Sequence, residues 1–127
     1  MNEVGTILLS IKPEYCLRIL NGEKKFEFRK HIAQNNVNKI VIYSTSPEKA
    51  VVGEVEVIGV LSMKKTPLWE MTKENAGISR EKYRAYFKEC DTAYAYRLGK
   101  AIRYDKPREL SEYGITQAPQ SFVYLEN

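Results

Sequence analysis

The sequence contains few of the residue types that metal sites and most catalytic triads require. Its 127 residues include one histidine, His31, and two cysteines, Cys16 and Cys90, which lie far apart and lack metal-ligand spacing. We therefore expect no metal site, no cofactor and two free thiols. Because a lone histidine cannot be placed against either cysteine from sequence, nothing predicts a Ser-His-Asp or Cys-His arrangement.

Long apolar runs and low-complexity segments are also missing. No run approaches the roughly 20 apolar residues that span a bilayer, and the N-terminal segment MNEVGTILLS lacks a basic region before its apolar stretch. We therefore expect a cytoplasmic protein that does not contact a membrane. With 43% hydrophobic and 28% charged residues, the composition is typical of a globular chain. No repeat or linker divides it, so we expect one domain over residues 1–127.

Short apolar and β-branched runs predict strands in both halves of the chain. The strands are expected at residues 6–12, 24–30, 38–44, 50–61, 92–104 and 120–125. Pro13 at one end and Asn21 with Gly22 at the other bound a short helix after the first strand. Gly53 and Gly59 interrupt the fourth run and predict a bulge or bend there.

Two helices are predicted in the middle of the chain, where the apolar spacing changes. The first has Thr66 as N-cap and Pro67 as first helical residue and closes at Gly77, and the second is capped by Ser79. Their aromatic residues recur at helical spacing, which predicts core positions rather than ligand contacts. These residues are Trp69, Tyr83, Tyr86 and Phe87. Together the elements predict an α+β fold with a small, curved, partly closed β-barrel and helices packed on its outside.

Positive charge is concentrated late in the chain. The formal net charge is only +4, but residues 97–108 hold five basic residues and a single acid, Asp105, with tyrosines within or beside the stretch. Basic side chains neutralise phosphates and aromatic rings stack on unpaired bases, so the stretch is a candidate contact for nucleic acid. The alternative is a solvated edge strand whose tyrosines pack inward, and the sequence leaves both interpretations open.

The stretch GEKKFEFRK, residues 22–30, places alternating charges around two phenylalanines. Glu27 and Arg29 share one strand face at positions i and i+2, close enough for the carboxylate to orient the guanidinium. A guanidinium held in this way suits a phosphate or a stacked base. Lys24 begins the strand and supplies a point charge for phosphate or a polarising acid. A solvated strand face is the alternative interpretation of the same alternation.

The same stretch carries a family resemblance. Gly22, Lys24, Glu27 and Arg29 match every position of the motif G-x-K-x-x-E-x-R, and LLSIKPEYCLRILNGEKKFEFRK resembles the opening of ASCH domains in the PUA-like superfamily. The resemblance continues in order through VVGEVEV, GISREKYRAYF and APQSFVYL. It implies a PUA-like β-barrel with a cleft beside the first helix, in which the motif residues lie. It also implies a role linked to RNA, transcription or translation, although a few members resemble ribonucleases or hydrolases of modified nucleosides.

The resemblance also bears on catalysis. Amidohydrolases of acetylated cytidine in this family use a lysine, a threonine and a glutamate, and the lysine and glutamate are similar in position to Lys24 and Glu74. Glu27 occupies the threonine position, which removes the hydroxyl nucleophile and favours a non-catalytic module. Lys24, Glu27 and Glu74 remain the catalytic candidates, with a carboxylate activating water and Lys24 stabilising the oxyanion. An exposed residue near a helix end is the alternative interpretation of Glu74.

Ligand contacts are expected from the motif and from strand ends that flank the cleft by resemblance. Ser44 offers a hydroxyl, although turn chemistry ahead of Pro47 explains it equally well, and Gln120 and Ser121 are able to read a base edge. The candidate set is Lys12, Lys24, Glu27, Arg29, Ser44, Tyr96, Arg97, Gln120 and Ser121. We expect an RNA or nucleotide-like ligand, bound by a module that regulates transcription or translation. The alternative is a small hydrolase, either a ribonuclease or an amidohydrolase of a modified nucleoside.

Overall fold

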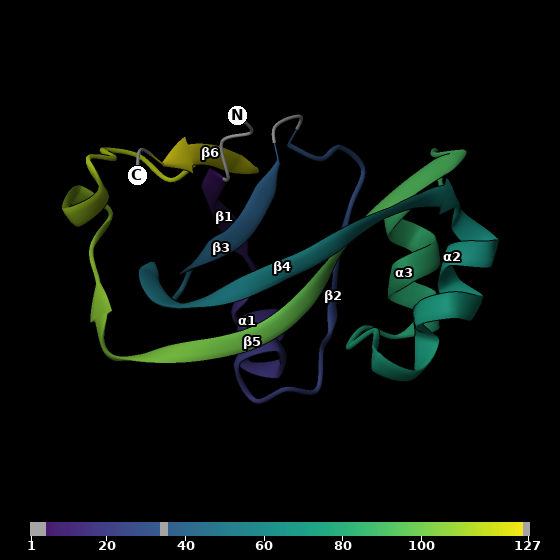
Figure 1. The fold of residues 1–127 in the computed structure, drawn as a ribbon, viewed down its shortest axis with the longest axis horizontal. Helices are drawn as coiled ribbons and strands as arrows, with labels where there is room; N and C mark the ends of the chain where they lie inside the picture. Colours follow the sequence, from purple (N-terminus) through teal and green to yellow (C-terminus); the bar gives the residue numbers. More distant parts are fainter. Residues whose placement is uncertain (1–4, 34–35, 126–127) are drawn as a thin grey trace.

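The computed structural model describes residues 5–33 and 36–125, which form an α+β fold around a six-stranded mixed sheet (Figure 1). The strands are β1 (Gly5–Ile11), β2 (Phe26–Arg29), β3 (Val37–Ser44), β4 (Ala50–Lys64), β5 (Thr92–Arg108) and β6 (Phe122–Leu125). The helices are α1 (Pro13–Leu20), α2 (Lys65–Thr72) and α3 (Arg80–Tyr86), with short 3₁₀ helices at Lys73–Asn75 and Leu110–Tyr113. The strand order is β2-β5-β4-β3-β1-β6, in which β1 and β3 are parallel and the other neighbours antiparallel.

The segment from β1 through α1 follows the sequence prediction closely. Pro13 stands at the start of α1 and Glu14 lies in the first turn, where the helix dipole favours an acid. Gly22 turns the chain after the helix with a φ of 87°, a conformation that glycine adopts at little cost. This turn leads directly into β2, so the end of α1 fixes where the motif strand begins.

β4 and β5 form a long antiparallel ribbon that curves across the molecule, with α2 and α3 at one end (Figure 1). The pairing of β4 is irregular next to Gly53 and Gly59, which confirms the predicted bends. Gly53 also permits a close approach, because a β-carbon there would lie 2.5 Å from the carbonyl oxygen of Ile102. The curved ribbon contributes to a core beneath α1, to another beneath α2 and α3, and, through Val51 and Tyr104, to a third that includes Leu8 of β1.

The sheet is open, which corrects the prediction of a partly closed barrel. Its edge strands are β2 and β6, each only four residues long, and no ladder joins these edges within the described residues. A side chain crosses from β2 to β1 instead: Arg29 donates a hydrogen bond to the carbonyl oxygen of Ser10 at 2.8 Å. Both residues line a cleft.

The two central helices have different bounds from those that the sequence suggests. α2 begins at Lys65, so Thr66 and Pro67 lie inside its first turn, and it ends at Thr72 rather than near Gly77. Ser79 caps α3 as predicted, and its hydroxyl accepts a hydrogen bond from the N–H of Lys82 at 3.2 Å. None of the helices in the described part of the chain is long and apolar enough to cross a membrane.

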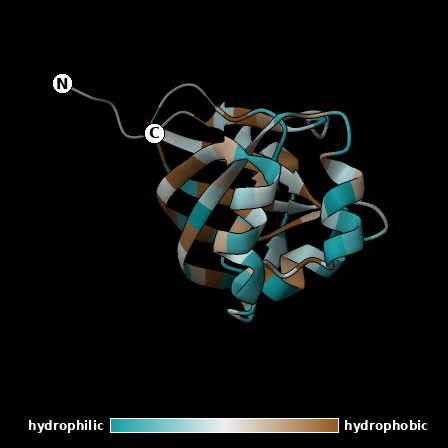
Figure 2. Ribbon diagram, turned by 90° about the vertical axis from the view of Figure 1, so that its right-hand side faces the viewer, coloured by the Kyte–Doolittle hydropathy of each residue, from teal (hydrophilic) through white to brown (hydrophobic). Residues whose placement is uncertain are grey.

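The aromatic residues of these helices divide between the core and two cavities. Tyr83 and Phe87 are buried as predicted, with ring centres 4.9 Å apart. Trp69 and Tyr86 pack against the same core but are only partly buried, and each also lines a cavity, so the core prediction holds for them only in part. Hydrophobic and hydrophilic residues alternate along the curved strands (Figure 2), because one face of the sheet is covered and the other is solvated.

Candidate functional site

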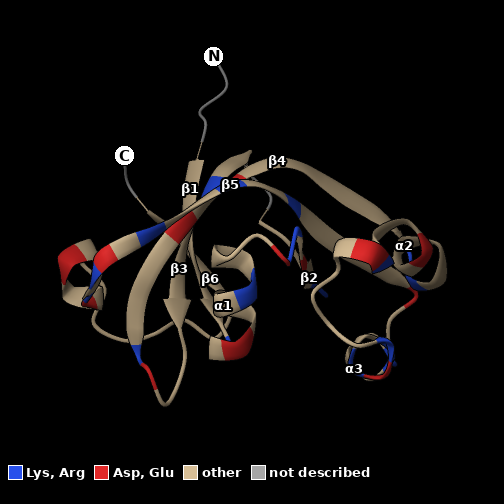
Figure 3. Cartoon of the chain, turned by 90° about the horizontal axis from the view of Figure 1, so that it is seen from below, with Lys and Arg blue, Asp and Glu red and all other residues tan. Residues whose placement is uncertain are grey.

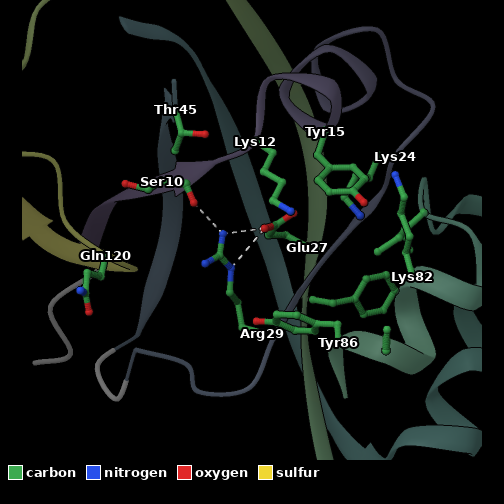
Figure 4. Close-up of a pocket in the computed structure, with 13 residues that line it drawn as sticks. Ser10, Lys12, Tyr15, Lys24, Glu27, Arg29, Thr45, Lys82, Tyr86 and Gln120 are labelled. Atoms are coloured by element: carbon green, nitrogen blue, oxygen red, sulfur yellow. Dashed lines mark hydrogen bonds and ion pairs between the residues drawn. The ribbon is translucent and has the colours of Figure 1, made fainter. Parts of the chain in front are cut away.

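A cleft of about 670 Å³ is bounded on one side by α1 and the end of β1 and on the other side by α3 (Figure 4). β2 contributes Glu27 and Arg29, and the segment before it contributes Lys24; Figure 3 shows this strand between α1 and the pair formed by α2 and α3. The walls therefore come from segments that lie far apart in the sequence. The polar and aromatic side chains that line the cleft are Ser10, Lys12, Tyr15, Lys24, Glu27, Phe28, Arg29, Thr45, Lys82, Tyr86 and Gln120.

Arg29 and Glu27 form a nearly buried ion pair on one face of β2. The Nη2 and Nε atoms of Arg29 donate to the same carboxylate oxygen, Oε2 of Glu27, at 2.8 and 3.2 Å, and the side chains are 14% and 8% exposed. Nη2 also donates to the carbonyl of Ser10, which fixes the guanidinium between two strands (Figure 4). Nη1 of Arg29 and Oε1 of Glu27 have no hydrogen-bond partner in the described part of the chain. Each therefore remains able to contact a ligand.

Lys24 places a buried ammonium at the wall of the cleft. The residue is 3% exposed, and its Nζ donates to the carbonyl oxygen of Ala76 at 2.7 Å. The same Nζ lies 4.9 Å from the ring centre of Phe28 and 5.2 Å from that of Tyr15, distances typical of cation–π contacts. The pKa of Lys24 is lowered to about 8, mainly because burial disfavours the charged form; Glu27 opposes this shift, and the positive charges of Arg18 and Arg29 add to it. A lysine in this state binds phosphate when protonated and can transfer a proton near physiological pH.

Gly77 makes room for this lysine. Its φ of 66° favours glycine, and a β-carbon at this position would collide with the side-chain stem of Lys24. The Gly77 carbonyl accepts a hydrogen bond from Nη1 of Arg18 at 2.9 Å. The turn that precedes α3 is therefore tied to α1, and it packs directly on the buried lysine.

Positive charge outweighs negative charge around the cleft. Lys12 at the end of β1 and Lys82 on α3 join Lys24 and Arg29, against one carboxylate, Glu27, among the described lining residues. That carboxylate is already paired with Arg29, so the remaining charge favours an anion. Lys82 also lies 3.5 Å from the exposed Glu14, a kind of surface pair that contributes little energy.

Two tyrosines border the same space, Tyr15 from α1 and Tyr86 from α3 (Figure 4). The hydroxyl of Tyr86 accepts a hydrogen bond from the N–H of Lys30 at 3.3 Å, and the Lys30 Nζ lies 4.8 Å from the ring centre. These contacts attach α3 to the residue that follows β2. An aromatic ring held beside a cationic cleft is a surface on which an unpaired base can stack.

The structure brings together some of the predicted ligand contacts and separates others. Those that line the cleft are Lys12, Lys24, Glu27, Arg29 and Gln120. Tyr96 is corrected to a core residue: it is 1% exposed, and its hydroxyl accepts a hydrogen bond from the N–H of Ala33. Ser44 is fully buried and Arg97 is exposed outside the cleft. Ser121 does not line the cleft either, although its carbonyl accepts the N–H of Ser10 and so anchors β6.

Glu74 and the basic stretch also lie away from the cleft. Glu74 is exposed on the 3₁₀ helix that follows α2, and the nearby Ala76 reaches Lys24 through its carbonyl instead. Residues 97–108 run along β5, and none of them lines the cleft in the part of the chain that the structure describes. Arg108 at the end of this stretch stacks on Tyr104 at 3.7 Å, an internal contact. Glu27 is thus the carboxylate among the catalytic candidates that faces the cleft.

Lys82 and Tyr86 are lining residues that the sequence alone does not identify. Their spacing of four places them on one face of α3, and that spacing is the available signal. The face that turns toward β2 is decided by the packing of Tyr83 and Phe87 into the core beneath the helix. That packing is a tertiary property, and no local pattern in the sequence reveals it.

The family model of the ASCH domain matches residues 9–107 of the chain. The protein belongs to the ASCH domain family. The resemblance drawn from the G-x-K-x-x-E-x-R motif is thereby confirmed, and in this ASCH domain the lysine, glutamate and arginine of the motif line one cleft.

Relatives and a solved structure agree with this assignment. An ASCH domain-containing ribonuclease from Zymomonas mobilis is 32% identical over 122 residues, which cover 93% of this chain and 82% of the relative. The crystal structure of ASCH from Zymomonas mobilis superposes with a TM-score of 0.88 at 28% identity, covering 95% of this chain and 87% of that one. The large ribosomal subunit protein uL22 of Ureaplasma parvum is 34% identical over 95% of this chain, but the chain spans only 39% of that protein.

Proposed function

We propose that this ASCH domain binds single-stranded RNA in the cleft beside β2, with a phosphate on Lys24 and Arg29. The observation that carries the proposal is that the nearly buried cations of Lys24 and Arg29 face one cleft and keep hydrogen-bond donors available for a ligand. Nη1 of Arg29 has no partner in the described residues, and the Lys24 ammonium donates to one carbonyl only. Burying a charge is costly without a compensating partner, and an incoming phosphate supplies one.

The cleft also suits an unpaired base. Its volume of about 670 Å³ exceeds what a phosphate alone requires, and Tyr15 and Tyr86 supply ring surfaces beside the cations. Gln120 at the opposite end carries an amide that can donate to and accept from a base edge. Bases in a duplex are stacked and cannot enter such a space, so the proposal concerns single strands.

Lys24→Met should weaken the binding of a short oligoadenylate by roughly 10- to 150-fold, the loss expected when a charge-assisted hydrogen bond of about 1.5–3 kcal/mol is removed. The slope of log affinity against log salt should fall by about 0.7, the value for one phosphate contact on a single strand. Fluorescence anisotropy of labelled RNA measures both. Lys25→Met is the matched control, because Lys25 is exposed and lies outside the cleft. Equal affinities of the two variants would contradict the placement of the phosphate.

The same variant gives a pH test. The pKa of Lys24 is lowered to about 8, so the ammonium that binds phosphate is present below pH 8 and is lost as the pH rises above it. Wild-type affinity should therefore be constant up to about pH 8 and then fall by up to tenfold per pH unit, since binding takes up one proton. The Lys24→Met protein should show a flat profile over this range. A flat wild-type profile would show that Lys24 does not contact the anion.

Cleavage of the bound RNA is a second candidate function, and a specific observation favours it. The Zymomonas mobilis relative is named a ribonuclease, and the alignment covers most of both chains. In this cleft the free Oε1 of Glu27 can accept the proton of a ribose 2′-hydroxyl as it attacks the adjacent phosphorus. Lys24, with its pKa near 8, can stabilise the phosphate and donate a proton to the leaving 5′-oxygen. Arg29 positions Glu27 and holds a second phosphate oxygen.

Two finer functions remain predictions. A role in regulating transcription or translation follows from the family resemblance alone. Hydrolysis of an acetylated nucleoside could not use Glu74, one of the two carboxylates expected for it, because Glu74 is exposed outside the cleft. Glu27 would have to act alone as the base, with Lys24 at the oxyanion.

A further inference from the structure

A second cavity of about 490 Å³ lies between α2 and α3, on the side of α3 that faces away from the cleft. We call it the α2–α3 groove and define it by six of its lining residues, Lys65, Trp69, Glu70, Arg80, Arg84 and Lys88. Neither the motif nor the proposed function uses any of them. The groove combines a partly exposed indole with an excess of positive charge.

The positive charge forms a stripe along α3. Arg80, Arg84 and Lys88 recur at intervals of four residues, which places them on one side of the helix and its C-terminal turn. The side chains of Arg84 and Lys88 have no hydrogen bond or ion pair within the residues that the structure describes. The acid of the groove, Glu70, is paired with Lys73 at 2.8 Å and also interacts electrostatically with Arg80, which leaves Arg84 and Lys88 as the unpaired cations among the described residues of the stripe. These cations are free to attract an anionic polymer.

Trp69 is held in a fixed position beside this stripe. Its ring lies 4.8 Å from that of Tyr83, and the Tyr83 hydroxyl donates to the carbonyl of Lys65 at 2.7 Å. Tyr83 in turn packs edge-on against Phe28, with ring centres 5.1 Å apart. A partly buried indole on a rigid support, flanked by free cations, is the combination on which single-stranded nucleic acids stack.

The groove and the cleft meet on α3. Ala85 lines both cavities, while Lys82 and Tyr86 line the cleft and Arg84 and Lys88 line the groove. A strand leaving the cleft can therefore cross α3 over a small side chain and continue along a cationic surface. We propose that the α2–α3 groove is a second nucleotide subsite for the same RNA strand, with a base on Trp69 and phosphates on Arg84 and Lys88. This inference rests on the proposed function of the cleft.

Trp69 is the only tryptophan of the chain, so its fluorescence reports on the groove directly. A trinucleotide that fills the cleft should bind without changing this fluorescence. A decanucleotide, within the range of site sizes known for single-strand binders, should bind more tightly and quench it. Quenching by an acidic peptide but not by the decanucleotide would overturn the inference in favour of a protein partner.

The double variant Arg84→Ala/Lys88→Ala tests whether these two side chains bind phosphates of the RNA. It should lower the affinity of the decanucleotide by about tenfold and its salt slope by about 1.4, which is twice the value per phosphate, and leave the trinucleotide unchanged. Lys100→Ala/Arg103→Ala removes the same charge from β5, outside both cavities, and serves as the control. An equal loss of decanucleotide affinity in the control would show that the positive charge of the protein attracts RNA without a defined subsite, and would overturn the inference.

Failure of the inference and failure of the proposed function give different results. If the trinucleotide binds in a Lys24-dependent way and the decanucleotide binds no more tightly, the cleft is the whole site and the groove is not a subsite. If neither oligonucleotide depends on Lys24, the proposed function itself is wrong, and the subsite is rejected with it. A melt of each variant confirms that the fold is retained.

Discussion

Replacing Arg29 by alanine should lower the free energy of unfolding by about 3 kcal/mol, because it leaves the carboxylate of Glu27 without its partner in a nearly buried position. The estimate lies at the lower end for a broken buried pair, since Glu27 lines the cleft and water can reach its free oxygen. The substitution also removes the side chain that ties β2 to the carbonyl of Ser10. Urea denaturation of wild type and variant measures the loss.

Two further variants show whether the unpaired carboxylate of Glu27 causes this loss of stability. Arg29→Ala/Glu27→Ala should be more stable than Arg29→Ala by about 1–2 kcal/mol, because the unpaired carboxylate is gone. Lys73→Ala breaks an ion pair of the same 2.8 Å length whose side chains are 48% and 59% exposed, and it should leave the stability almost unchanged because water screens the pair. An Arg29→Ala protein as stable as Lys73→Ala would show that the motif pair does not stabilise the fold.

Changing Glu27 to glutamine should reduce RNA cleavage by about 10²- to 10⁴-fold, the usual contribution of a general base. Glutamine keeps the size of the side chain and an oxygen that can accept from Arg29, so the geometry of the cleft is retained while the base is lost. Incubating labelled RNA with the purified protein and separating the products by chromatography measures the rate. Lys24→Met should lower the same rate, since it removes the proposed acid.

Glu74→Gln is the matched control for this substitution. Glu74 is the other carboxylate that the sequence nominates, and it is exposed outside the cleft, so its loss should leave cleavage unchanged. Cleavage that is indifferent to Glu27 and Lys24 would place the activity elsewhere. RNA that binds without being cut would reject the second candidate function and leave the binding function intact.

The motif could be placed from sequence because its signals are local. Pro13 and Gly22 mark the ends of α1, and the alternation after Gly22 puts Glu27 and Arg29 on one strand face. The structure adds what local patterns do not contain. Lys24 is buried against Ala76 and Gly77, residues that lie about fifty positions later, and this burial is the cause of its lowered pKa.

The predictions that failed depend on tertiary packing. Tyr96 is adjacent to the exposed Arg97 on β5, and only the pairing of β5 with β2 and β4 decides that its ring enters the core. The core prediction holds only in part for Trp69 and Tyr86, which pack against the core of Tyr83 and Phe87 without being fully buried. The order of the elements and the bends at Gly53 and Gly59 predict a partly closed barrel, but the short edge strands β2 and β6 leave the sheet open.

A crystal structure of the protein with a short 2′-O-methyl oligonucleotide tests the central claim most directly, because such a strand cannot be cut by its own 2′-oxygen. We predict a phosphate oxygen within about 3 Å of both Nη1 of Arg29 and Nζ of Lys24, with a base beside Tyr86. An oligonucleotide bound along residues 97–108 of β5, with the cleft beside β2 empty, would contradict the account.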